Sequence, residues 1–282
     1  MRRDLHEANR RSWNAATLAH QSHKRDQAGF LRSGGTTLFP EERELLGEVA
    51  GKAVAHLQCN AGQDTLSIAA LGARVIGVDI SDDAIRLARE LSRDSGIAAV
   101  FERADVYDWL EIESPESSFD VAFCSYGALC WLSDVERWAR GVGRVLAPGG
   151  RLALVEFHPV LDALDDAGIP RHSYFGRGEP RTWVEGVADY VARSGAALAP
   201  SGFENGTRDF VNPSPCHEFT WPVADVVQAV LNAGLTLETL REWPYANGCR
   251  VLTALVERPG RRFVMPEGGP ELPLMFGLAA RK

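Results

Sequence analysis

The chain of 282 residues is long enough for one large α/β domain, or for such a domain with a sizeable insertion. Its formal net charge of −8 argues against a nucleic-acid-binding groove, because neutralising phosphate groups requires clustered lysine and arginine. Five scattered cysteines without a CxxC pair, a charged N-terminus without a signal-peptide segment and no apolar run of bilayer length predict a cytoplasmic protein with reduced thiols.

The first 27 residues predict a helix, because apolar side chains recur on an approximately helical stripe. The same segment is unusually rich in polar side chains, which fits either a solvated amphipathic helix or a cap that closes over a ligand. His20 and His23 could share one helix face, but this spacing alone does not predict a metal pair. Pro40 then opens a second helix with two acidic residues in its first turn, which is favourable at a helix N-terminus.

Residues 53–58 form an apolar run that ends in a short loop of small and polar residues, and a helical pattern begins at Gln63. A second apolar run, over residues 73–79, ends in Asp79. This order of strand, loop, helix, strand and acid is typical of a nucleoside-binding α/β unit. The backbone N–H groups of such a loop face a polar ligand, and the acid accepts hydrogen bonds from ribose hydroxyls. The GxGxxG fingerprint of dinucleotide-binding proteins is absent.

The alternation of strands and helices continues to His158 and then stops. Residues 160–218 are rich in glycine, proline, serine and aromatic residues, and they are too apolar for a disordered linker. We therefore predict an insertion that packs on the carboxyl edge of the sheet. Residues 245–270 fit no regular pattern. The remaining predicted elements are strands over residues 98–101, 119–125, 151–157, 235–242 and 272–280, and helices between Ser81 and Gly96, Ser133 and Leu146, and Pro222 and Gly234.

The stretch AHLQCNAG resembles motif I of the class I S-adenosylmethionine-dependent methyltransferases, which reads like LDLGCGTG. His56 stands where the family usually has an acid, and Gln58 and Asn60 replace the first two glycines. Gly62 is retained, and Asn60 can keep the turn because asparagine tolerates positive φ better than other non-glycine residues. The run FDVAFCS, followed by RVLAPGGRLALVE, is also similar to the family, so the resemblance covers residues 53–157.

The resemblance implies an α/β fold with a Rossmann-like sheet of seven strands, helices on both faces and an antiparallel pair at the end of the chain. We expect an N-terminal helical cap over residues 1–50 and a cofactor-binding domain over residues 51–158 and 219–282. Residues 159–218 are expected to form an insertion or lid over the acceptor pocket. The implied cofactor is S-adenosylmethionine, bound outside the carboxyl ends of the strands.

The resemblance assigns the cofactor mainly to side chains that follow the first four strands. Asp79 is expected to accept hydrogen bonds from the ribose, and Asp105 from the adenine amino group, with Val106 packed on the ring. The structural alternatives are a helix-capping acid at Asp79 and a solvated loop acid at Asp105. The complete set expected to bind the cofactor is Trp13, Gln58, Asn60, Gly62, Gln63, Asp79, Ile80, Asp105, Val106 and Ser125.

The acceptor is expected between the cap, the insertion and the ends of the fourth and fifth strands. Tyr126 and Trp131 present aromatic rings where a sulfonium can lie on a ring face. His158 ends the fifth strand, where it could remove a proton from the acceptor or simply hydrogen-bond to the backbone. The catalytic candidates are His158 and Tyr126, and the substrate-binding candidates are Trp131, Leu129 and Tyr174.

Two further groups are weaker acid–base candidates. Glu156 lies two residues before His158 and would have a raised pKa if it were buried. The position of His217 and Glu218 depends on how the insertion folds. Carboxylate clusters resembling the Mg²⁺ site of catechol methyltransferases are absent, so we predict no metal.

The sequence therefore predicts a methyltransferase of secondary metabolism that acts on a small, largely apolar acceptor and releases S-adenosylhomocysteine. The aromatic insertion favours a ring-containing acceptor, such as a heteroaromatic like indole, without deciding among carbon, nitrogen and oxygen. A macromolecular substrate is disfavoured by the acidic charge and by Cys-Ser-Tyr-Gly in place of an Asn/Asp-Pro-Pro-Tyr motif. A non-catalytic cofactor-binding regulator is the other alternative. No nucleic-acid or membrane partner is predicted, and a homodimer is left open.

Overall fold

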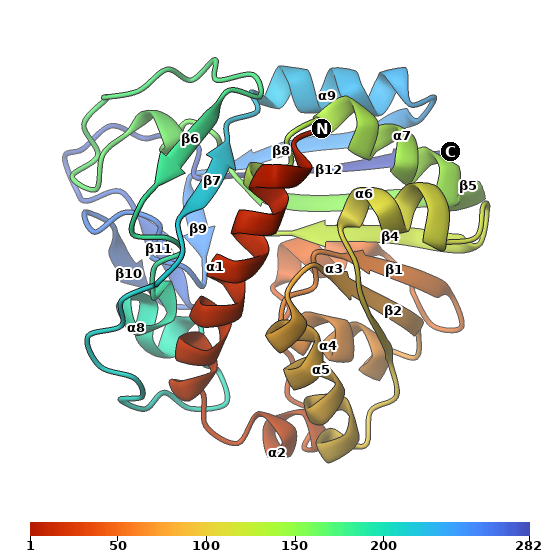
Figure 1. Ribbon diagram of the computed structural model, residues 1–282, viewed down its shortest axis with the longest axis horizontal. Coiled ribbons are helices and arrows are strands. Elements are labelled where there is room, and N and C mark those ends of the chain that lie inside the picture. The colour runs from red at the N-terminus through yellow and green to blue at the C-terminus, as the bar shows by residue number, and fades with distance from the viewer.

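A mixed sheet of seven strands, in the order β3-β2-β1-β4-β5-β12-β8, forms the centre of the structure, a computed structural model that describes residues 1–282 (Figure 1). The five strands from β3 to β5 are parallel, whereas β12 is antiparallel to both β5 and β8. This topology confirms the predicted fold. The strands are β1 (Ala53–Leu57), β2 (Arg74–Asp79), β3 (Val100–Arg103), β4 (Phe119–Ser125), β5 (Leu146–Phe157), β8 (Thr236–Trp243) and β12 (Met275–Arg281).

Helices cover both faces of this sheet because its inner strands are apolar on both sides. Neighbouring residues of β1 show the alternation: Ala55 belongs to a buried cluster under α7 and α9, and Val54 belongs to one under α3 and α4. The helices outside the insertion are α1 (Arg3–Ser22), α2 (Gln27–Arg32), α3 (Pro40–Leu46), α4 (Gln63–Ala70), α5 (Asp82–Ser95), α6 (Val106–Asp108), α7 (Val135–Val145) and α9 (Val223–Asn232), with short helical turns at Trp109–Glu113 and Leu129–Trp131. None of the helices combines the length and the apolar character that a membrane-spanning helix requires.

The helix predicted over residues 1–27 ends earlier than expected, and a separate helix, α2, begins at Gln27. Helix α1 ends at Ser22, and Asp26 caps α2 by accepting a hydrogen bond from the Gly29 N–H at 2.8 Å. Helix α1, coloured red, crosses the front of the molecule between the sheet and the lobe that contains β6 (Pro180–Trp183), β7 (Cys216–Phe219) and α8 (Tyr190–Ser194) (Figure 1). It therefore lies beside elements that are far from it in sequence.

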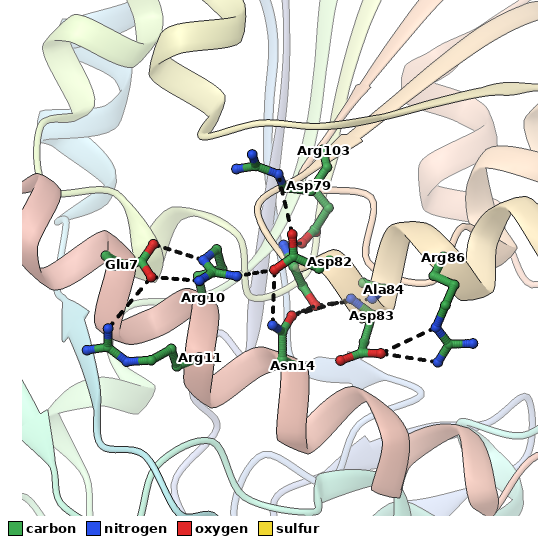
Figure 2. A network of polar contacts seen from close by, with 11 residues as sticks. Glu7, Arg10, Arg11, Asn14, Asp79, Asp82, Asp83, Ala84, Arg86 and Arg103 are labelled. Carbon is green, nitrogen blue, oxygen red and sulfur yellow. Dashed lines mark hydrogen bonds and ion pairs between the residues drawn. The ribbon is translucent and has the colours of Figure 1, made fainter.

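Helix α1 is attached on both sides. Toward α5, the Asn14 side-chain oxygen accepts from the Ser81 hydroxyl at 2.7 Å, and Arg10 pairs with Asp82 (Figure 2). Toward β7, the Asn9 side-chain amide donates to the His217 carbonyl at 2.8 Å and accepts from its N–H at 2.7 Å. This paired contact joins the helix to the edge of the two-stranded sheet formed by β6 and β7.

The segments without regular alternation fold into small β-structures beside the main sheet. In the insertion, β6 and β7 pair antiparallel, with short helical turns at Leu161–Ala163 and Gly195–Ala197. The unassigned residues 245–270 contain a three-stranded sheet in the order β10-β11-β9, formed by β9 (Tyr245–Asn247), β10 (Val256–Arg258) and β11 (Arg262–Val264). Strands of three residues are too short to show a period in the sequence.

The helix predicted between Ser133 and Leu146 is α7, and Ser133 does not cap it. The N-cap of α7 is Asp134, whose carboxylate accepts from the Arg137 N–H at 2.9 Å. The Ser133 hydroxyl instead accepts from the Arg2 N–H at 3.0 Å and hydrogen-bonds to His6 at 2.8 Å. The N-terminal helix supplies these partners, and a local capping pattern carries no information about them.

Candidate functional site

A cavity of about 840 Å³ lies at the carboxyl edge of the parallel strands. Each of the five parallel strands is followed by residues that line it, and α1, the insertion and β9 complete its walls. In open α/β sheets, ligands bind at this edge, where the strand order reverses between β1 and β4. Representative lining residues after β1, β2, β3, β4 and β5 are Gln58, Ile80, Asp105, Ser125 and His158.

The loop after β1 has a left-handed backbone at three positions. Gln58, Asn60 and Gly62 have φ values of 55°, 49° and 78°. A side chain at Gly62 would place its Cβ 2.7 Å from the Phe101 ring, so this glycine is required for packing as well as for backbone conformation. Gln58 is fixed in the loop because its side-chain amide donates to the Ala128 carbonyl at 2.7 Å. The loop therefore keeps the turn without two of the expected glycines.

Asp79 holds this loop and lines the cavity. Its carboxylate accepts from the Asn60 N–H at 2.8 Å and from the Ser81 N–H at 2.9 Å. Burial raises the pKa of Asp79, and the backbone hydrogen bonds partly offset that effect. Each carboxylate oxygen has a second lone pair, so two bonded N–H groups leave acceptor capacity for ligand hydroxyls.

Asp105 connects the end of β3 to the N-terminal helix. One carboxylate oxygen accepts from the Tyr107 N–H at 3.0 Å, which caps α6, and the other accepts from His6 Nδ1–H at 2.7 Å. The imidazole of His6 stacks on the Tyr107 ring, with centroids 5.3 Å apart. Val106 follows as a buried wall of the cavity. His6 was not among the predicted site residues, because its partner is 99 residues away.

Another part of the cavity is polar and includes residues that the sequence did not assign. Gln63, a predicted cofactor ligand, donates to the side chains of Gln21 at 3.0 Å and Gln27 at 2.6 Å. Lys24 lines the same cavity, where burial lowers its pKa to about 8. The polar density of the first helix was the only sequence signal for these side chains. Gln21, Gln27 and Lys24 add two amides and one amine to the cavity.

His56 replaces the acid of motif I with a neutral group. Its side chain is buried, Nδ1 hydrogen-bonds with the Thr65 hydroxyl at 2.8 Å, and burial lowers its pKa to about 4. Asp64, which also lines the cavity, accepts from the Thr37 hydroxyl. No group of three or more His, Cys, Asp or Glu side chains is arranged to hold a metal ion.

The aromatic candidates Tyr126, Trp131 and Trp13 all line the cavity, as does Leu129. Trp13 and Trp131 meet edge to face, with centroids 5.4 Å apart, so the first helix and the segment after β4 share one wall. Tyr126 accepts from the Asn247 amide at 3.0 Å, and burial raises the pKa of its hydroxyl well above the ordinary value. Tyr126 therefore presents a neutral ring to the cavity.

His158 lines the cavity, but both of its ring nitrogens have partners. Nε2–H donates to Glu242 at 2.9 Å, and Nδ1 accepts from the Val160 N–H at 3.0 Å. Burial lowers the pKa of His158, and the Glu242 carboxylate partly offsets this. A histidine acting as a base needs a free lone pair, so this arrangement favours the backbone-bonded alternative over proton removal.

Tyr174 lies outside the cavity, whereas Glu156 lines it but is bonded to backbone N–H groups. Tyr174 does not line it: its hydroxyl accepts from the Val223 N–H at 3.1 Å, and its ring stacks behind His158 at 6.4 Å. The folding of the insertion places this ring beside His158 and outside the cavity. Glu156 is buried with a raised pKa, as predicted, but its carboxylate holds the loop after β4 by accepting from backbone N–H groups, including Ala128 at 2.8 Å and Leu129 at 2.9 Å.

Comparisons with known proteins agree with this geometry. A family model described as a methyltransferase domain matches residues 54–150. The ubiquinone biosynthesis O-methyltransferase of Xanthomonas euvesicatoria pv. vesicatoria is 30% identical over 193 residues, which cover 68% of this chain and 65% of that protein. The S-adenosyl-L-methionine-dependent Diels-Alderase iccD of Talaromyces variabilis is 33% identical over 154 residues, or 51% of this chain and 52% of that protein. The chain thus spans between half and two thirds of the length of these relatives.

The fold is also found among solved structures. An S-adenosylmethionine-dependent methyltransferase from Mesorhizobium loti aligns with a TM-score of 0.55 at 22% identity, covering 86% of this chain and 96% of the other. At this identity the likeness concerns the fold. The family match ends at residue 150, so it includes the loop after β1, Asp79 and Asp105 but not the insertion.

Proposed function

The chain carries a class I S-adenosylmethionine-dependent methyltransferase domain, and from this premise we propose that the protein methylates a small, largely apolar acceptor and releases S-adenosylhomocysteine. The cavity is the observation that carries the proposal. It joins the loop after β1, Asp79 and Asp105 to an apolar region with Leu129 and Trp131, so one space can hold a nucleoside and an acceptor together.

The residues around the first three strands fit the cofactor. The N–H groups of residues 59–62 are bonded within the protein, so the left-handed loop offers the cofactor its shape, and Asp79 retains acceptor capacity for ribose hydroxyls. Asp105 can accept from an adenine amino group beside the Val106 side chain, while His6 holds its carboxylate in place. When bound, the cofactor supplies an electrophilic methyl group on a sulfonium.

The remaining residues position the acceptor and exclude water. Trp13 and Trp131 form an aromatic wall, Tyr126 adds a neutral ring, and His158 shapes the cavity near the end of β5. A ring-containing acceptor suits these surfaces, and one relative takes its name from the biosynthesis of a quinone. We propose that α1 and residues 159–218 together act as the lid, since α1 is attached to both sides of the cavity.

Two measurements test this function. Titration calorimetry with S-adenosylhomocysteine should show saturable binding, and absence of binding would refute the proposal. Incubation of metabolite pools with S-adenosylmethionine carrying a trideuterated methyl group should yield small molecules with the label, detected by mass spectrometry. Binding without any labelled product would favour the non-catalytic regulator.

A second candidate function is cyclisation of an apolar substrate with the cofactor bound but not consumed. The similarity to a relative named a Diels-Alderase favours it, together with the large cavity. Conversion of S-adenosylmethionine to S-adenosylhomocysteine in step with product distinguishes the two, because cyclisation leaves the cofactor unchanged.

A further inference from the structure

The two-stranded sheet of β6 and β7 places alternate side chains toward the cavity and away from it. Arg181 is the cross-strand partner of Glu218, and Trp183 is the partner of Cys216. All four line the cavity. Because side chains alternate along a strand, the residues between them face the other way. Thr182 and His217 do so: they hydrogen-bond to each other at 2.9 Å, and neither lines the cavity.

The alternation separates the predicted acid–base pair. The His217 side chain lies on the face away from the cavity, with its backbone bound by Asn9 at the strand edge, whereas Glu218 faces the cavity. The Glu218 carboxylate accepts from Trp183 Nε1–H at 2.6 Å, which fixes its direction. Arg181 does not neutralise it directly, because its guanidinium donates to the Asp162 carbonyl at 2.9 Å and lies 5.6 Å from the centre of the Trp183 ring.

Asp162, at the turn after β5, is a second carboxyl group in the same part of the cavity. Burial raises its pKa to about 6. Burial, followed by the charge of Asp162, raises the pKa of Glu218 to about 7, while the Trp183 hydrogen bond and Arg181 act in the opposite direction. Both side chains keep part of their surface accessible, so a ligand can reach them.

A wholly apolar acceptor would press hydrocarbon against these carboxyl groups and remove their water without replacing its hydrogen bonds, which is unfavourable. The surrounding surface nevertheless favours a flat apolar body. Trp131 and Trp221 both line the cavity, and the Trp221 N–H is already bonded to the Leu132 carbonyl at 2.8 Å, so its ring is what remains for contact. A matching acceptor therefore combines an aromatic body with a hydrogen-bond donor.

We infer that Glu218, assisted by Asp162, is the group that recognises the acceptor, and that the acceptor is an aromatic compound with a hydroxyl or amino donor. This inference rests on the proposed methyl transfer, since it takes this part of the cavity as the acceptor half. It deepens the proposal by favouring phenols and aromatic amines over hydrocarbons and ethers.

The test compares two probes in which a methyl group replaces the donor hydrogen. Binding of 2-naphthol and of 2-methoxynaphthalene to the full chain, saturated with S-adenosylhomocysteine, is measured by equilibrium dialysis. We expect 2-naphthol to bind at least about tenfold more tightly, the scale of a hydrogen bond to a charged group. Glu218→Gln should reduce that ratio to about threefold or less. The matched control Glu179→Gln, at an exposed glutamate outside the cavity, should leave it unchanged.

A pH series on the unaltered protein needs no substitution. The charged groups near Glu218 are Asp162 and Arg181, and the thiols of Cys130 and Cys216 have raised pKa values and stay neutral. The preference for 2-naphthol should increase as the pH rises through about 7, because the carboxylate accepts more strongly than the neutral acid, and it should lose this dependence in Glu218→Gln.

The outcomes separate the inference from the proposed function. Equal affinity for the two probes, binding of neither, or an equal loss of both in Glu218→Gln would overturn the inference. Failure of S-adenosylhomocysteine to bind would overturn the proposed function instead, and the ratio of the two probes in the unliganded protein would still decide whether Glu218 selects a donor.

Discussion

Several carboxylates that line the cavity also accept hydrogen bonds from the backbone around it. Asp79 accepts from two backbone N–H groups, Asp105 caps α6 and binds His6, and Glu156 holds the loop after β4. A carboxylate can do both because its two oxygens offer about four acceptor positions. Substitutions at these residues are therefore expected to change loop order together with ligand affinity.

Asp79→Ala should weaken binding of S-adenosylmethionine by about 1.5–3 kcal/mol, the scale of hydrogen bonds to a charged group. It should also lower thermal stability, because the N–H groups of Asn60 and Ser81 lose their acceptor. Calorimetry and thermal melting measure the two effects. Asp83→Ala, whose carboxylate pairs with Arg86 at the surface, serves as the control. Unchanged affinity in a folded Asp79→Ala protein would remove Asp79 from the cofactor site.

His158→Ala should change the Michaelis constant and the range of accepted substrates more than turnover. Both ring nitrogens are bonded, so the histidine shapes the cavity in this conformation without offering a free lone pair. Steady-state kinetics over a pH series, with an acceptor found by labelled-methyl transfer, provide the measurement. A decrease in turnover of about 10²-fold or more, with loss of an ionisation from the pH profile, would instead establish a general base.

At the scale of elements, α1 is the part that connects the cofactor region to the insertion. Its side chains reach α5 through Asn14 and Arg10, α4 through Gln21, and β7 through Asn9. Most of these contacts are polar and partly exposed, and few buried apolar residues support them. Such elements open at a lower free energy than a sheet core.

Bound S-adenosylhomocysteine should slow amide hydrogen exchange in residues 10–30. The ligand is expected to contact Trp13 and the Gln21–Gln63 pair, which adds binding free energy to the closed position of α1. Mass spectrometry of exchanged peptides gives the measurement, and Asn14→Ala, which loses the contact with Ser81, should exchange faster without ligand. Protection confined to residues 53–125 would show that α1 is not a cap.

At the scale of the whole molecule, burial of a residue that lines the cavity makes stability depend on pH. His56 has a pKa lowered to about 4, below its ordinary value of 6.5. The folded state therefore prefers the neutral imidazole. This contribution to stability is present above about pH 6.5 and is lost as the pH falls toward 4, because only the unfolded chain takes up the proton over that range.

Between about pH 7 and pH 5, His56 should reduce the free energy of unfolding by about 2 kcal/mol. Buried acids with raised pKa values, such as Glu156, act in the opposite direction, so the test is a comparison with His56→Gln. Urea denaturation at several pH values should show a smaller acid loss in the variant. Identical pH dependence in both proteins would mean that His56 becomes protonated without opposing the fold.

The order of strands and helices, the loop after β1 and the acid at Asp79 followed from the sequence by itself, because they depend on local periodicity and on spacing within one βα unit. The loop kept its turn despite Gln58 and Asn60, since both adopt positive φ. Local signals also predicted the two strands near the C-terminus, whereas their antiparallel pairing was implied by the family resemblance; β12 pairs with both β5 and β8 and so completes the sheet.

Only the tertiary structure decided what each polar side chain faces. Glu242 and Val160 engage His158, His6 reaches Asp105 across 99 residues, and the insertion carries Tyr174 out of the cavity. Pairing of β6 with β7 directs Glu218 toward the cavity and His217 away from it. A one-residue change of register would have reversed these directions. The direction of a side chain is set by partners distant in sequence, and those partners are chosen by packing of the whole chain rather than by any local pattern.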